Sequence, residues 1–371
     1  MLKRLIIIAI AIGSAVFFIL FTDLESLSSA VFSMPASSLL LLVVLLLGNE
    51  LLKAARWAYL LRASKLRIRR TDAITSYLAS QAASSLPGGS VMSARLAEEH
   101  GQIRMYQAIS SLVAQVIGDF FSPAVLAIIA ILLTGQPPLQ IIMPIVTILI
   151  GFGCIAVVRS RRIAFSLTNF LQRWRLTRRF VPEEADFWEH SALLMKPRVM
   201  LNTINIGIVS TVISAITIWI ITDALTDRGI TFSEALYAHS FSVVARHVIP
   251  VPSGIGISDA SLAGVLNYIG IGLARATFIA LAYRTIGMIF RTFLGLLVLV
   301  ARYPYLIVSS LRVPAQSPAL APESESASEE AGRESTVASP AGRRPSRRPR
   351  HHPNPTNPDP TTHEAVHHTM H

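Results

Sequence analysis

The sequence has a single cysteine in 371 residues, which excludes a disulfide framework and a cysteine-rich metal site. It also lacks the local patterns by which common enzymes are recognised: it has no metal-ligand spacing, no Walker-type phosphate loop and no nucleophile elbow. We therefore expect no enzymatic activity, no catalytic residue, no bound metal and no cofactor.

The chain is too apolar for a soluble protein of its length. Hydrophobic residues make up 52% of it, and the mean hydropathy is +0.52. The apolar residues come in blocks long enough to cross a hydrocarbon core of ~30 Å. Six full spans are predicted, at residues 5–21, 38–61, 106–134, 139–158, 201–224 and 276–301. No small-residue cleavage site follows the first span, so we interpret it as a retained signal-anchor.

The charged residues indicate topology. Basic loops at residues 62–70 and 159–198 alternate with acidic or neutral loops near residues 23–25, 135–138 and 223–234. Under the positive-inside rule, both termini are cytoplasmic in a plasma or inner membrane.

The chain divides into a transmembrane domain, residues 1–312, and a tail, residues 313–371. The tail is rich in Pro, Ser, Arg and His, and this composition predicts disorder. Beside a cytoplasmic membrane face, its basic runs favour contact with anionic lipids, so we expect no nucleic-acid partner.

Two moderately apolar segments, residues 72–101 and 232–270, are interrupted by proline and glycine. The first break reads LPGG at residues 86–89, and the second reads PVPSGIG at residues 250–256. A helix of about a dozen residues covers about half a bilayer, so each segment is predicted to form a re-entrant hairpin of two half-helices. The predicted hinge residues are Pro87, Gly88, Gly89, Pro250, Pro252, Gly254 and Gly256.

The first hairpin follows a basic loop and the second follows an acidic one, so they should enter the membrane from opposite faces. This arrangement is typical of an inverted repeat. Gly101 and Gly118 have the same spacing as Gly270 and Gly287, which supports the repeat. The predicted fold class is an all-α polytopic membrane protein, with about six transmembrane helices and two re-entrant hairpins in an inverted repeat.

Ionisable residues inside the spans indicate a candidate site, because a charge at the bilayer centre costs roughly 2.5–3.5 kcal/mol and seldom faces lipid. Arg284 and Arg291 lie on one face of the last span, together with Gly287 and Gly295, which we expect to pack closely. Asp119 ends a polar stripe on the third span and could pair with either arginine. Such a buried pair, fixing the helix packing, is the structural alternative to a substrate role.

The two breaks would place helix N-termini near the midplane, with Ser90 and Ser258 as N-caps. Each terminus carries about +0.5 charge, which suits an anionic phosphate headgroup. Lys53 and Arg56 are expected to snorkel to the headgroups. The residues predicted to bind a substrate are Arg95, Arg246, Arg284, Arg291, Asp119, Ser90, Ser258 and Asp259.

The break at residues 86–89 with Arg95 after it, and the run PVPSGIGISD at residues 250–259 with Arg284 downstream, resemble the lysylphosphatidylglycerol synthase transmembrane-region family. The resemblance covers approximately residues 5–312 by hydropathy. Family members usually show PGxxGExxR at the first break, whereas this chain has Val91 and Met92 at the Gly and Glu positions. At the second break, Asp259 stands where the family usually has Glu.

In the best-known relatives, this region translocates lipid beside a soluble aminoacyltransferase domain, and no such domain is recognisable here. The resemblance therefore implies a flippase-like translocase for an anionic phospholipid or a lipid-linked precursor. The alternative is a non-transporting scaffold or accessory subunit that binds lipid or an envelope-biosynthesis enzyme. The expected partners are the bilayer and an anionic lipid, and a homo-oligomer or an envelope-enzyme partner stays open.

Overall fold

The computed structural model describes residues 34–83, 89, 91–100, 103–160, 185–226, 228–248 and 256–304. The secondary structure of these residues is helical. Five helices are long and apolar enough to cross a membrane: α3 (Ala36–Ala63), α6 (Met105–Leu133), the segment Pro138–Arg159, α10 (Pro197–Leu225) and α13 (Leu273–Arg302). The segment Pro138–Arg159 comprises the short helix η2 (Pro138–Ile141) and α7 (Ile142–Arg159).

The all-α polytopic class is thereby confirmed, as are five of the six predicted spans. The first predicted span, residues 5–21, and the tail, residues 313–371, lie outside the described residues. The spans present many apolar side chains outward, among them Leu40, Leu149 and Phe293. Lipid is the solvent in which such surfaces are stable, since a soluble protein rarely exposes large contiguous apolar patches.

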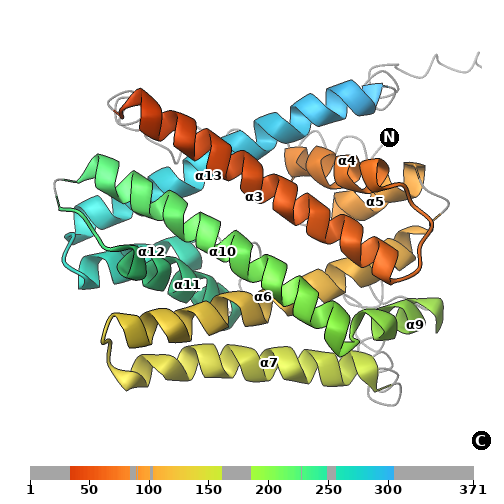
Figure 1. Ribbon diagram of the computed structural model, residues 1–371, viewed down its shortest axis with the longest axis horizontal. Helices are drawn as coiled ribbons and strands as arrows, with labels where there is room; N and C mark the ends of the chain where they lie inside the picture. Colours follow the sequence, from red (N-terminus) through yellow and green to blue (C-terminus); the bar gives the residue numbers. More distant parts are fainter. Residues whose placement is uncertain are drawn as a thin grey trace, which may run out of the picture. The chain divides into compact units, whose positions relative to one another are not determined.

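Glycine allows the central spans to approach closely. α10 packs against α3 and against α6, and α7 lies on the other side of α6 (Figure 1). A Cβ at Gly207 of α10 would lie 2.2 Å from the Ser122 hydroxyl of α6, and a Cβ at Gly118 would lie 2.8 Å from a methyl carbon of Thr203. Small residues at helix contacts are the usual means of tight packing in membranes.

The first interrupted segment forms α4 (Arg70–Ser80), the short helix η1 (Gln81–Ala83) and α5 (Val91–His100), and α4 packs against α5. The second forms α11 (Phe232–Val248) and α12 (Ile257–Tyr268), which also pack together. At 17 residues, or about 25 Å, α11 is longer than the half-helix we predicted. No proline stands between Phe232 and Val248 to end it earlier.

The two helix pairs lie near opposite ends of the bundle. α4 and α5 lie near the C-terminal end of α3, whereas α11 and α12 lie near the C-terminal end of α10 (Figure 1). Because α10 runs antiparallel to α3, these two ends are on opposite sides of the bundle. This placement agrees with opposite directions of entry, although re-entry itself and the inverted repeat stay predictions.

Most of the predicted hinge residues, Pro87, Gly88, Pro250, Pro252 and Gly254, lie outside the described residues. The carbonyl of Gly89 accepts the N–H of Met92 at 3.0 Å, beside the start of α5. Gly256 has a φ of +88°, which favours glycine, and it precedes α12.

The first interrupted segment packs against α13, and one glycine allows the closest approach, at η1. A Cβ at Gly295 would lie 2.1 Å from the backbone nitrogen of Ala82, so only glycine allows this approach. The close packing expected at Gly295 is confirmed. The close packing expected at Gly287 is wrong, because a Cβ there would meet nothing within 4 Å.

Candidate functional site

A cavity of about 470 Å³ lies between α3, α6, α10, α11, α12 and α13, and Tyr77 of α4 also lines it. The lining residues fall near the middle of the long spans: 46–56 of α3, 115–123 of α6, 207–217 of α10 and 283–291 of α13. The cavity therefore lies about halfway across any membrane that these helices span, the depth at which transporters hold their substrates.

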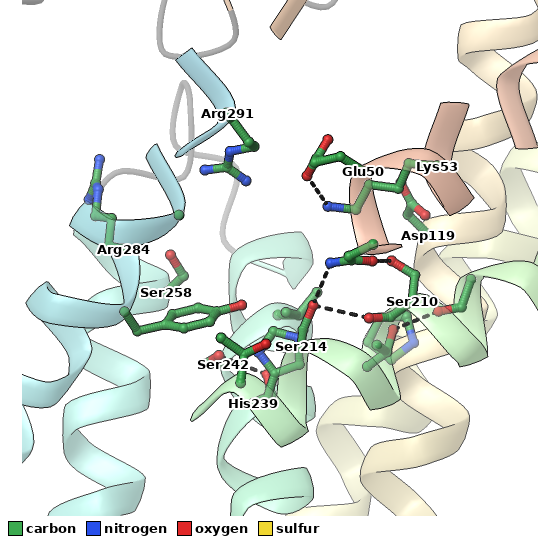
Figure 2. Close-up of a pocket in the computed structure, with 18 of the residues that line it drawn as sticks. Glu50, Lys53, Asp119, Ser210, Ser214, His239, Ser242, Ser258, Arg284 and Arg291 are labelled. Atoms are coloured by element: carbon green, nitrogen blue, oxygen red, sulfur yellow. Dashed lines mark hydrogen bonds and ion pairs between the residues drawn. The ribbon is translucent and has the colours of Figure 1, made fainter. Parts of the chain in front are cut away.

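Charged side chains make this cavity unusual for a membrane interior. Figure 2 shows them projecting from several helices around one space. The cations are Lys53, Arg56, Arg246, Arg284 and Arg291, and the carboxylates are Glu50, Asp119 and Asp259. Five positive charges less three negative ones leave a formal surplus of two positive charges.

Two ion pairs lie on the α3 side of the cavity. Lys53 Nζ lies 3.0 Å from Glu50 Oε1, and Arg56 Nη1 donates a hydrogen bond of 2.7 Å to Asp119 Oδ1. The pairing that we expected between Asp119 and an arginine of α13 is therefore wrong.

The reason for the Arg56 pairing is the local packing. Nη1 of Arg56 lies only 3.1 Å from the position that a Cβ would take at Gly207, so α10 leaves room for a buried guanidinium that reaches α6. Arg56 is buried, and the snorkelling expected of it is wrong as well.

The third ion pair joins Arg284 of α13 to Asp259 of α12, with Arg284 Nη1 donating to Asp259 Oδ2. Gly256 is the N-cap of α12, which corrects the prediction of Ser258. Asp259 Oδ2 also accepts the backbone N–H of Gly256, at 3.4 Å. The chain's own carboxylate thus occupies the N-terminus that we expected to bind a phosphate. Ser258 still lines the cavity, whereas Ser90 lies outside the described residues.

Arg246 and Arg291 carry the surplus charge. Among the residues that the structure describes, neither forms an ion pair with a carboxylate. Arg291 Nε is buried and has no hydrogen-bond partner there. Because guanidinium stays protonated, each of these groups needs an anion or water in the cavity.

Arg95 does not join the other predicted residues. It lies on α5, its side chain is 55% exposed, and it pairs with Glu98 and with Glu99, the latter at 3.8 Å. From the pair α4 and α5, the residue that lines the cavity is Tyr77 of α4. The departure at Val91 and Met92 from the family's pattern falls on this same helix.

A buried hydroxyl and amide network borders the cavity (Figure 2), and sequence reasoning missed its serines, Ser210 and Ser214. The Asn49 amide donates to Ser214 Oγ at 3.1 Å, and Ser210 Oγ donates to Asn49 Oδ1 at 2.6 Å. His239 lies close by, and its Nδ1 is buried without a partner among the described residues. The four-residue spacing of Ser210 and Ser214 in an apolar span was the available signal.

The fold and the cavity define a polytopic helical membrane protein with a charged cavity of about 470 Å³ at mid-membrane depth. The family described as "Lysylphosphatidylglycerol synthase TM region" matches residues 6–295. The chain belongs to this family, and the match spans every residue that lines the cavity. A search of the curated proteins and a search of the solved structures found no match.

Proposed function

We propose that this chain is a flippase-like translocase, which moves an anionic phospholipid or a lipid-linked precursor across the cell membrane with both of its termini in the cytoplasm. The observation that carries the proposal is the surplus of two positive charges, on Arg246 and Arg291, in a cavity at the middle of the spans. The proposal assigns no catalytic chemistry to the cavity.

A charge in the membrane interior is costly unless it is paired, and the residues that carry such charges commonly mark transport pathways. Glu50, Asp119 and Asp259 each compensate one cation, and the pairs of Asp119 and Asp259 also join neighbouring helices. Arg246 and Arg291 have no such structural partner among the described residues, so an anionic headgroup would complete the charge balance. Arginine suits this purpose, because its planar guanidinium group can donate two parallel hydrogen bonds to a pair of phosphate oxygens.

The helix pairs support a mechanism of movement. In this proposal, α4 with α5 and α11 with α12 belong to two related halves that rock around the cavity and open it to one leaflet at a time. α11 contributes Arg246 and α13 contributes Arg291, so relative motion of these helices would change the grip on a headgroup.

A translocation assay in proteoliposomes tests the proposal. Acyl-labelled phosphatidylglycerol and acyl-labelled phosphatidic acid are each reconstituted with the parent protein, and an impermeant quencher reports the movement of each lipid between leaflets. Gly287→Leu is the decisive variant, because Gly287 lines the cavity and a Cβ there meets nothing within 4 Å. The leucine should occupy part of the cavity beside Arg291 and lower the rate about tenfold or more, a barrier increase of about 1.4 kcal/mol.

Gly153→Leu is the matched control. Gly153 lies on the exposed surface of α7, and a Cβ there also meets nothing within 4 Å. We expect this variant to translocate at the parental rate. A parent protein that moves no lipid faster than protein-free liposomes would contradict translocation. Lipid binding without movement would favour the non-transporting scaffold or accessory subunit.

A further inference from the structure

The charge balance of the cavity narrows the class of headgroup. Three of its cations are neutralised by the chain's own carboxylates, Glu50, Asp119 and Asp259. The remaining two, Arg246 and Arg291, have no carboxylate partner in the described part of the chain. A ligand with one negative charge would compensate only one of them.

The two arginines line the same cavity, although they come from different helices. Arg246 lies in the last turn of α11, and Arg291 lies near the middle of α13. One headgroup held in this cavity would therefore be exposed to the charge of both guanidinium groups.

The cavity has room for such a headgroup next to Arg291. Gly287 lies one helical turn before Arg291 and leaves open space. The volume of about 470 Å³ falls within the range of pockets that hold small ligands, which is about 300–1,000 Å³.

Resting on the proposed function, we infer that the cavity takes a headgroup with two negative charges: a lipid phosphomonoester or diphosphate. A phosphomonoester carries about −1.5 to −2 charge near neutral pH, which matches the surplus. A phosphodiester headgroup with one charge leaves one guanidinium uncompensated. An aminoacylated headgroup with a net positive charge would be repelled by both.

Binding to the purified full chain tests this inference. Three probes are titrated at neutral pH: dihexanoyl phosphatidic acid, which is a phosphomonoester; dihexanoyl phosphatidylglycerol, which is a phosphodiester; and inorganic pyrophosphate, which carries no lipid. Because the monoester gains one further charge-assisted contact, it should bind about tenfold or more tightly than the diester. Pyrophosphate should bind more weakly than phosphatidic acid, because it lacks the acyl chains.

Variants connect the preference to the cavity. Arg246→Gln and Arg291→Gln should each lower the preference for the monoester to about twofold or less, since one surplus charge remains. Arg291→Lys keeps the charge and should keep most of the preference. Arg104→Gln is the control, because Arg104 is exposed and lies outside the cavity, and it should bind all three probes as the parent does.

The outcomes separate this inference from the proposed function. Equal affinity of the parent for the two lipids would overturn the inference of a dianionic headgroup but would not contradict the proposed translocation of an anionic lipid. A preference that survives both glutamine variants would overturn it too, because the cavity would not be its source. Binding of neither lipid would contradict the inference and the proposed function together. Pyrophosphate binding as tight as that of phosphatidic acid would indicate a soluble phosphate ligand and overturn the lipid assignment.

Discussion

The ion pair between Arg56 and Asp119 predicts that substituting Asp119 destabilises the protein more than substituting Arg56. The Arg56 side chain is 4% exposed, whereas that of Asp119 is 38% exposed. Asp119→Asn leaves a deeply buried guanidinium without a compensating charge. Arg56→Met leaves a carboxylate that faces the cavity, where water can solvate it. The first substitution should therefore destabilise the protein more than the second.

The expected magnitudes follow from this difference. Breaking a buried pair by removing one partner costs about 3–5 kcal/mol. The amide in Asp119→Asn can still accept one hydrogen bond, so we expect a loss near the lower end, about 3 kcal/mol. For Arg56→Met we expect about 1 kcal/mol, because the pair's net contribution falls as the remaining charge becomes hydrated. Methionine has a similar length, so no large void opens.

The assay is the free energy of unfolding by SDS titration in mixed micelles, for the parent, both single variants and the double variant. The double variant should lose less than the sum of the single losses, by about 1 kcal/mol or more. In a control cycle, Asp119→Asn combined with Arg284→Gln should be additive within about 0.5 kcal/mol, since Arg284 pairs with Asp259. Equal single losses would refute the argument from hydration, and additive losses, or coupling of Asp119 to Arg284 instead, would refute the pairing.

Two further predictions concern the fold and its orientation. Gly295→Ala should lower the free energy of unfolding by about 1–3 kcal/mol, because the new Cβ meets the backbone of η1. Gly264→Ala is the control: it has open space around it and should raise the free energy of unfolding by about 0.4–1 kcal/mol. Equal effects of the two variants on thermal unfolding would contradict the close packing at Gly295. In a Cys154→Ala background, a cysteine that replaces Gln136 should react with an impermeant thiol reagent in intact cells, whereas a cysteine that replaces Arg67 should not. Labelling of position 67 from outside would contradict the predicted orientation.

The spans could be predicted closely from the sequence, because hydropathy over about twenty residues reports the length that crosses a bilayer. The convergence of distant residues could be predicted in part. Arg284, Arg291 and Asp119 were selected because charges in apolar spans must face the protein interior, and Arg246 and Asp259 because they flank the second break. All five line one cavity.

The pairing of these charges could not be predicted, because it depends on how the helices are rotated against one another. Gly207 brings α10 close to α6 and makes room for Arg56. The sequence alone does not show which neighbouring helix a single glycine in an apolar span will contact. Likewise, Asp259 lies at the third position of α12, where it competes with any external anion for the helix N-terminus.

The central claim is that a lipid headgroup enters the cavity at mid-membrane depth, and photo-crosslinking tests it most directly. An anionic phospholipid with a photoreactive group on its headgroup is reconstituted with the parent protein and irradiated, and the adducts are mapped by mass spectrometry. We expect adducts on the middle of α13, at cavity-lining residues such as Met288, and their loss in Gly287→Leu. Adducts confined to the ends of α13, near Leu273 or Arg302, would show that headgroups stay at the membrane surface and would contradict the claim.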